Sequence, residues 1–216
     1  MSDVLIGLIP AATISGLGAG WGGRCLLRRL RRGVTLHPPW CEPAVAVLWT
    51  VATTIAAFGG FPAWWLPVPL ALGWLAVLLT ATDLARRRLP DALTLPAYPA
   101  AVVLLAVVSW LGPGVDLALR ALGGACLFGL AHAAVHLVAP TALGAGDVKL
   151  AGVLGALLGA VSWLALIQGA FLAGLVTLGL AALRPKTALP GVPHGPGLLT
   201  ATWTITVLPP AASPFG

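Results

Sequence analysis

The sequence predicts an all-α protein that crosses a membrane several times as a bundle of helices. Hydrophobic residues make up 59% of the 216 residues and charged residues only 8%, and the mean hydropathy is +0.99. A water-soluble domain carries about a quarter charged residues, so this composition excludes a protein whose whole surface faces water. A spanning helix takes roughly 20 apolar residues, which leaves little length for a separate soluble domain. We therefore predict one integral membrane domain over 1–216, with seven or eight membrane segments.

Each predicted segment is an apolar run. Proline stands inside several runs, for example Pro10 and Pro96, and membrane helices tolerate it because neighbouring helices satisfy the backbone groups that proline frees. The sixth and seventh runs are contiguous, so one bent helix is an alternative there. Small residues recur four apart at Ala151, Gly155 and Gly159, which predicts that another helix approaches that face closely. In chain order, the runs cover 4–20, 43–60, 63–82, 93–111, 115–139, 148–162, 163–183 and 197–212.

Basic residues follow the odd-numbered runs. Cytoplasmic loops of membrane proteins retain Lys and Arg, so these loops are predicted to be cytoplasmic and the N-terminus to lie outside. The exception is Arg120, one turn after Asp116, which we expect to reach the membrane interface or to pair with that acid. The basic residues that fit the pattern are Arg24, Arg28, Arg29, Arg31, Arg32, Arg86, Arg87, Arg88, Lys149, Arg184 and Lys186.

The isoelectric point of about 10.3 does not indicate a nucleic-acid partner. The positive charge follows the topology, and no soluble basic surface with interleaved aromatic residues is evident, so anionic lipid headgroups are the expected partners. The first 20 residues lack a basic start and a small-residue cleavage site, and we expect a retained helix. Cys25, Cys41 and Cys126 are widely spaced without a Cys-x-x-Cys pair, which predicts free thiols.

Two aspartates stand at the edges of apolar runs. Asp83 ends the third run, and Asp147 opens the sixth after Gly144-Ala145-Gly146. An acid at a membrane boundary is costly unless it is paired, solvated or functional, so each is a functional-site hypothesis. The predicted topology places both on the cytoplasmic side, and two antiparallel helices between them return the chain to the same membrane face. The two side chains are therefore expected to lie close together.

Two stretches of the sequence resemble the type IV prepilin peptidase family of membrane aspartic proteases, which belongs to the Gly-x-Gly-Asp class. They are ATDLARRRLPDALTLP at 81–96 and GAGDVKL at 144–150. The order and separation of the motifs fit, and VPHGPG at 192–197 also resembles a pattern near the family's C-terminus. The resemblance covers roughly 63–212. It implies catalytic residues Asp83 and Asp147, with Gly144, Gly146, Lys149, Pro90 and Asp91 supporting the site or binding substrate.

The resemblance also implies a function. Such enzymes cut the short basic leader from prepilins or pseudopilins at the cytoplasmic face of the bacterial plasma membrane, and they need no metal or organic cofactor for this. Larger members carry an insertion with paired Cys-x-x-Cys motifs after the first helix and are linked to N-methylation of the new N-terminus. Here the corresponding loop, about 24–42, has only Cys25 and Cys41 and is too short for a four-thiolate zinc module. This predicts a minimal peptidase without zinc and argues against methyltransferase activity.

Two acids suit peptide hydrolysis. One carboxylate takes a proton from the attacking water, while the other, protonated, donates to the developing oxyanion. Two carboxyls within a few Å share one proton. Asp147 opens a helix, where the positive dipole end favours a carboxylate, and Asp83 ends one, where the negative end disfavours it. We therefore expect Asp83 to hold the proton more often, although the titration belongs to the pair.

The supporting residues have mechanical interpretations. Gly144 and Gly146 allow backbone conformations and a close approach that a side chain would block, so a substrate strand is expected to pass there. Pro90 disfavours helix at the residue before it and so stops the third segment from continuing. Asp91 is expected to help start the fourth helix, with binding of a basic substrate leader as the alternative.

Other interpretations remain open. His132 and His136 share a helix face, and buried hydrogen bonding is favoured over a metal pair because no third ligand is apparent. Another protease of the Gly-x-Gly-Asp class would cut within a spanning helix, which the boundary position of Asp83 argues against. A transporter or channel would use the two acids to bind protons or cations, and it predicts acids nearer the membrane midplane.

Overall fold

The computed structural model describes residues 2–30, 34–36, 39–86, 89–140, 143–183 and 193–210, and the regular secondary structure within these ranges is entirely helical. Among the described residues, five stretches of helix are long and apolar enough to cross a membrane, and a shorter apolar helix accompanies them. The prediction of an all-α, multi-pass membrane bundle is confirmed. The elements are α1 (Ser2–Arg29), α2 (Cys41–Ala57), the 3-10 helix η1 (Ala63–Trp65), α3 (Pro67–Arg86), α4 (Asp91–Leu111), α5 (Val115–Val138), α6 (Ala145–Val161), α7 (Trp163–Ala182) and α8 (Gly195–Val207).

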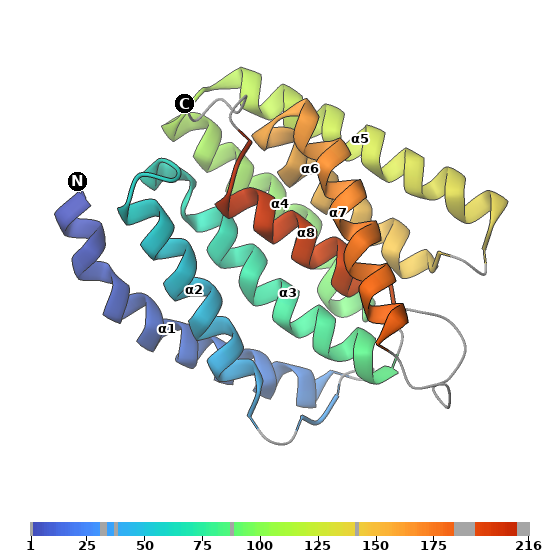
Figure 1. Cartoon of the computed structure of the whole chain (residues 1–216), viewed down its shortest axis with the longest axis horizontal. Helices are drawn as coiled ribbons and strands as arrows, with labels where there is room; N and C mark the ends of the chain where they lie inside the picture. The colour runs from blue at the N-terminus through green and yellow to red at the C-terminus, as the bar shows by residue number, and fades with distance from the viewer. Residues whose placement is uncertain are drawn as a thin grey trace.

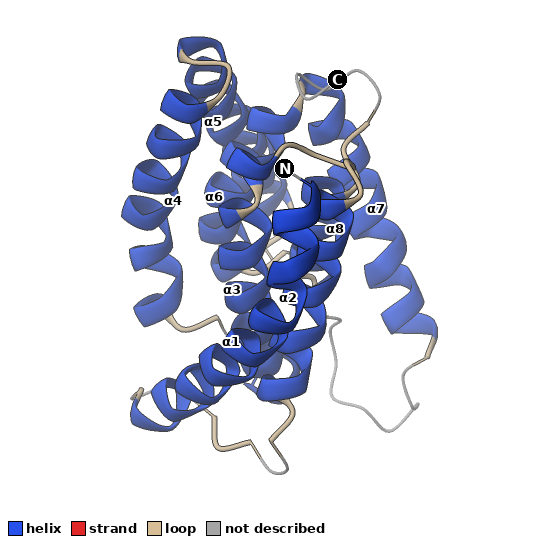
Figure 2. Cartoon of the chain, turned by 90° about the vertical axis from the view of Figure 1, so that its left-hand side faces the viewer, coloured by secondary structure: helices blue, strands red, loops and turns tan. Residues whose placement is uncertain are grey.

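Successive helices run in alternating directions (Figures 1 and 2). As a result, the C-terminal ends of α3 and α7 and the N-terminal ends of α4, α6 and α8 lie at one end of the bundle. This end contains both candidate acids, and the chain reaches it repeatedly because each odd-numbered helix ends there. The alternation is the arrangement that the predicted topology requires.

Two boundaries differ from the sequence prediction, and a third position settles an alternative that the sequence left open. Helix α1 runs to Arg29 and not to residue 20, because a helix continues into the interface after its apolar run has ended, and Leu27 in this extension is fully buried. Helices α6 and α7 are two elements, as the separate runs 148–162 and 163–183 predicted, and not one bent helix. The backbone is extended at Ser162, whose hydroxyl accepts a hydrogen bond from the Ala165 N–H and so caps α7. Helix α8 has only 13 residues and is mostly buried among its neighbours, so it need not match the bilayer thickness.

Glycines bring two pairs of helices into close contact. The predicted stripe on α6 packs against α5: a Cβ atom on Gly159 would lie 2.8 Å from Cα of Gly124, and one on Gly155 would lie 2.5 Å from the Gly124 carbonyl oxygen. On α1, a Cβ on Gly16 would lie 2.7 Å from Cα of Ala46 in α2. The predicted close approach at Gly155 and Gly159 is confirmed, and the helix that carries Asp147 is held against α5 by backbone contact.

Some expectations concern charged and polar residues at the helix ends. Arg24, predicted to lie in a loop, belongs to α1 and forms an ion pair of 2.7 Å with Glu42 of α2. The expected pair between Arg120 and Asp116 does not form, and within the described residues Nε and Nη2 of Arg120 are buried without a hydrogen-bond partner. The three cysteines are free thiols, as predicted. Residues of the sequence analysis that lie outside the described ranges are Arg31, Arg32, Arg87, Arg88, Arg184, Lys186 and Val192.

Candidate active site

Asp83 lies in the last turn of α3 and faces the interior of the bundle. It is only 5% exposed, although its neighbours Leu84 and Arg86 are exposed. Burial of a carboxyl removes it from water, so the position is costly for a carboxylate that has no function or compensating interaction. The structure places this acid where the sequence predicted, at the end of α3, and buries it more completely than a residue at a water boundary requires.

Asp147 lies in the first turn of α6, ahead of the apolar part of that helix. Its backbone N–H donates to the Gly144 carbonyl at 3.0 Å, which closes the turn that begins α6. Burial, together with the nearby Asp83, raises the pKa of Asp147 from 3.8 to about 6, against the lowering effect of a hydrogen bond from the Gly144 backbone. The two acids are therefore coupled, and this apparent value belongs to the pair.

Gly195, the first residue of α8, brings the two carboxyls together. A Cβ atom built on Gly195 would lie 2.7 Å from Oδ2 of Asp83 and 3.3 Å from Oδ1 of Asp147. Both carboxyl groups thus reach one point, although Asp83 belongs to α3 and Asp147 to α6. The N-terminal end of α8 lies against them, and its positive dipole end favours the ionised form, which opposes the effect of burial. The expected proximity of the two acids is observed.

The turn that carries Asp147 is held from both sides. From α5, the imidazole Nδ1 of His136 lies 2.7 Å from the Leu143 carbonyl, one residue before Gly144. From α4, the Tyr98 hydroxyl donates to the Lys149 carbonyl at 2.6 Å, and the Lys149 ammonium pairs with Asp91 at 2.8 Å. Because α4 and α5 both contact the start of α6, the position of Asp147 is fixed by long-range contacts as well as by its own helix.

The glycines of the Gly-x-Gly-Asp motif act through space and not through unusual backbone angles. Gly144 has φ −71° and ψ 146°, which any residue adopts, and within the described residues a positive φ occurs only at Gly59 and Gly114. A Cβ on Gly144 would lie 3.3 Å from Oδ2 of Asp147, and one on Gly146 would lie 3.3 Å from Cβ of Leu89. Both glycines therefore lie close to a neighbouring side chain, and Gly144 does not have the special conformation that was expected. The passage of a substrate strand beside them stays a prediction.

Asp91 begins α4, as the sequence predicted, and α3 ends at Arg86, before Pro90. The Pro90 carbonyl accepts the backbone N–H of Leu93 at 2.9 Å and that of Thr94 at 3.1 Å, which starts the helix. Asp91 is in the first turn, where an acid interacts favourably with the helix dipole, and its carboxylate also pairs with Lys149. The link between Asp91 and Lys149 joins the two sequence motifs, and the sequence analysis did not foresee it.

Two further residues lie beside the acid pair and were not assigned to the site from sequence. Gly195 contacts both carboxyls, and the only sequence signal for it was its place in the VPHGPG stretch. His194 precedes it, and its Nδ1 lies 2.8 Å from the Thr177 hydroxyl of α7. Because that hydroxyl already donates its proton to the Ala173 carbonyl, it accepts from Nδ1–H of His194. This bond fixes the start of α8, and thus Gly195, on α7.

The histidines of α5 do not form the metal pair that was one alternative. His132 directs Nδ1 to the Phe128 carbonyl at 2.8 Å and His136 directs its own to Leu143, so each ring is engaged with a different backbone group. The ring of His132 instead lies 6.3 Å from that of His194, measured between centroids. Across the described part of the chain, no three His, Cys, Asp or Glu side chains converge in a way that suits a metal ion.

Comparisons with known proteins match the part of the chain that carries both aspartates. The type IV leader peptidase family matches residues 70–180. A protein of Aeromonas hydrophila named prepilin leader peptidase/N-methyltransferase is 34% identical over 187 residues, which are 84% of this chain and 61% of that protein. A protein of the same name from Aeromonas salmonicida (strain A449) is 33% identical over 166 residues, 74% of this chain and 56% of that protein. The chain thus spans about three fifths of the length of these relatives. No solved structure is significantly similar to it.

Proposed function

The chain belongs to the type IV leader peptidase family, and we propose that it is a membrane aspartic endopeptidase that removes the short basic leader of type IV prepilins or pseudopilins. Residues 1–216 act as one membrane domain, and Asp83 and Asp147 are the catalytic residues. The observation that carries this proposal is the meeting of the two carboxyls at Gly195, from helices that are distant in sequence. A buried and a half-buried carboxyl that are coupled at one point are what hydrolysis by an aspartic mechanism needs.

The mechanism follows from this geometry. A water molecule between the carboxyls loses a proton to the ionised acid as its oxygen attacks the scissile carbonyl, and the protonated acid donates to the carbonyl oxygen. When the tetrahedral intermediate collapses, the C–N bond breaks and the departing nitrogen receives a proton from the pair. We assign the initial carboxylate to Asp147, at the start of α6, and the initial acid to the more buried Asp83, which has the more unfavourable site for a negative charge.

The neighbouring residues shape the site in this proposal. Gly144 and Gly146 keep the start of α6 free of side chains, Pro90 and Asp91 begin α4 beside it, and Lys149 joins the two helices. Basic residues that precede α2 and follow α3 in sequence support a cytoplasmic location for this end of the bundle, in the bacterial inner membrane. The cut is thereby made at the aqueous edge, while the apolar helix of the substrate stays in the bilayer.

The test is cleavage of a co-expressed model prepilin with Gly immediately before its hydrophobic segment. We expect Asp83→Asn and Asp147→Asn each to lower the cleavage rate at least about 100-fold, the usual scale for loss of a general acid or base. Asp116→Asn is the matched control, because this exposed aspartate opens α5 at the other end of the bundle. Membrane levels of all variants are measured by immunoblotting, and mass spectrometry of the product shows whether its new N-terminus carries a methyl group.

The outcomes separate the alternatives. Cleavage by the wild type and by Asp116→Asn, but by neither dyad variant, supports the paired-acid peptidase. Normal cleavage by either dyad variant removes that acid from the mechanism. If the wild type does not cleave the model prepilin, ion flux into vesicles that contain the purified protein tests the transporter alternative.

A further inference from the structure

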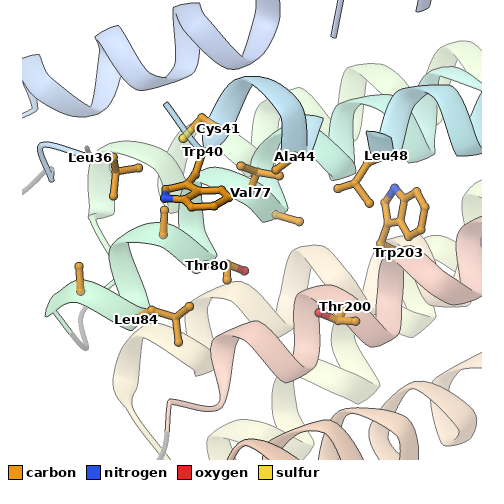
Figure 3. Close-up of a pocket in the computed structure, with 13 residues that line it drawn as sticks. Leu36, Trp40, Cys41, Ala44, Leu48, Val77, Thr80, Leu84, Thr200 and Trp203 are labelled. Atoms are coloured by element: carbon orange, nitrogen blue, oxygen red, sulfur yellow. The ribbon is translucent and has the colours of Figure 1, made fainter. Parts of the chain in front are cut away.

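A groove of about 530 Å³ lies between α2, α3 and α8, beside the candidate active site (Figure 3). Its α3 wall includes Ala76, Thr80, Ala81, Leu84 and Ala85, which are spaced so that they share one face of that helix. The wall is apolar apart from the hydroxyl of Thr80. The groove is therefore suited to an apolar occupant.

The opposite walls give the groove two distinct ends. Trp40, Ala44 and Leu48 contribute from α2 and the residue before it, and Thr200 and Trp203 contribute from α8. In Figure 3, Trp40 stands near Leu36 at one end and Trp203 stands near Leu48 at the other. The Trp40 side chain is 66% exposed, so its ring is accessible to lipid or to a bound partner.

The groove reaches the turn of α3 that carries Asp83. Leu84 and Ala85 of its wall directly follow Asp83, and α8, which forms another wall, begins at Gly195 against both carboxyls. From Ala85 to Ala76 the groove follows about 14 Å of α3, at 1.5 Å per residue. It therefore starts at the turn that carries Asp83 and runs from there toward the other end of the bundle.

We propose that this groove binds the first turns of the substrate's apolar helix, on the C-terminal side of the scissile bond. This inference rests on the proposed function, in which the cut lies just before that helix. A substrate whose scissile bond is at the acid pair has to enter the bilayer from that point, and about 14 Å accommodates between two and three helical turns. Ala76, Thr80, Ala81 and Ala85 are small, which lets a second helix approach α3 closely.

A second groove, of about 990 Å³, lies on another face of α3 and provides a control. It is lined mainly by α3 and α4, and its lining includes Ala71, Leu75 and Val103. Its α3 wall ends at Leu75, about two turns before Asp83. This larger groove borders the start of α4 at Ala92 and Leu93, but it does not reach the turn of α3 that carries Asp83. We therefore assign the substrate helix to the groove between α2, α3 and α8.

The kinetic test compares two variants that fill one groove each. Ala44→Phe fills the proposed groove from α2, which carries neither acid, and Ala71→Phe fills the second groove. Each is assayed with a full substrate that has its apolar helix and with a short soluble peptide that spans the cleavage site. We expect Ala44→Phe to lower kcat/KM for the full substrate at least about tenfold relative to the peptide, the scale of one excluded apolar side chain. Ala71→Phe should leave the ratio of kcat/KM for the full substrate to kcat/KM for the peptide within about twofold of the wild-type ratio. An unchanged ratio in Ala44→Phe, or an equal change in both variants, would overturn the assignment.

A binding test does not depend on cleavage. A photo-crosslinking residue replaces Trp40 in one variant and Val103 in another, each in the Asp83→Asn background; the two original side chains are similarly exposed, at 66% and 64%. Crosslinks from position 40, but not from 103, to the apolar segment of the substrate support the proposal. Crosslinks from position 40 to lipid alone, or equal capture at both positions, refute it. If crosslinking at position 40 succeeds and the wild type does not cleave, the groove assignment stands and the proposed peptidase function fails.

Discussion

The α5–α6 pair and the groove between α2, α3 and α8 use small residues in opposite ways. On α6, Gly155 and Gly159 are covered by the backbone of α5, close enough that no Cβ atom fits between the helices. On α3, Ala81 and Ala85 are not buried and line a groove that no other element of the described structure fills. The same kind of residue therefore closes one side of the site and leaves another side open.

The difference follows the requirements of the proposed chemistry. Helix α6 is buried along almost its whole length and carries Asp147, whose carboxyl has to be held near that of Asp83. A direct backbone contact gives such positioning because backbone atoms cannot rotate away. The face of α3 that lines the groove is in contact with α2 and α8 but is left partly open between them, and we propose that a substrate helix binds there. We infer that rigidity is placed at the acids and open space next to them.

The largest effect is expected when the contact between α5 and α6 is forced apart. Gly155→Val places a side chain where even a Cβ would be 2.5 Å from the Gly124 carbonyl oxygen. Overpacking of a core costs about 1 to 3 kcal/mol or more, and this site is at the upper end because the blocking atom is backbone. We expect a large loss of folded protein and of cleavage, measured as yield and thermal unfolding in detergent. Gly179→Val is the control, since nothing lies within 4 Å of a Cβ at Gly179. If Gly155→Val and Gly179→Val had equal yields and equal unfolding temperatures, the close contact between α5 and α6 at Gly155 would be contradicted.

A smaller and more selective effect is expected at the point where the acids meet. Gly195→Ala brings a methyl group within 2.7 Å of Oδ2 of Asp83, and a carboxyl can rotate away at little cost in stability. We expect kcat to fall about 100-fold, as for a misplaced catalytic group, while the unfolding temperature changes little. Gly174→Ala, where nothing lies within 4 Å, is the matched control. A variant that unfolds early, or one that cleaves at the wild-type rate, would show that Gly195 does not position the acids.

The smallest effect is expected at the ion pair that joins α4 to α6. The side chains of Lys149 and Asp91 are 45% and 48% exposed, and an exposed pair contributes about 0 to 1 kcal/mol. Lys149→Gln and Asp91→Asn should each change the cleavage rate less than about threefold. If Asp91 instead receives the basic leader, Asp91→Asn raises KM for a substrate with a basic leader but not for one with a neutral leader. Comparison of the two substrates therefore decides between these roles.

Much of the candidate site could be predicted because its signals are local. Asp83 and Asp147 stand at the ends of apolar runs, so the hydropathy pattern along the sequence places both at helix ends. The alternation of helix directions places them at the same end of the bundle. The stripe at Gly155 and Gly159 was visible as a four-residue repeat. Gly195 could not be assigned from its sequence, because its importance comes from two carboxyls that are far away in the chain and lie against it only in the folded bundle.

The sequence by itself determined the membrane class, the order of the helices, the two acids and the family, because hydropathy and short motifs depend on residues that are near in the chain. Only the tertiary structure decided that α8 begins against both acids, that Lys149 pairs with Asp91, and that a groove follows α3 from Asp83. These features depend on how faces of different helices meet. Side-chain packing between distant segments sets those contacts, and no local pattern encodes them.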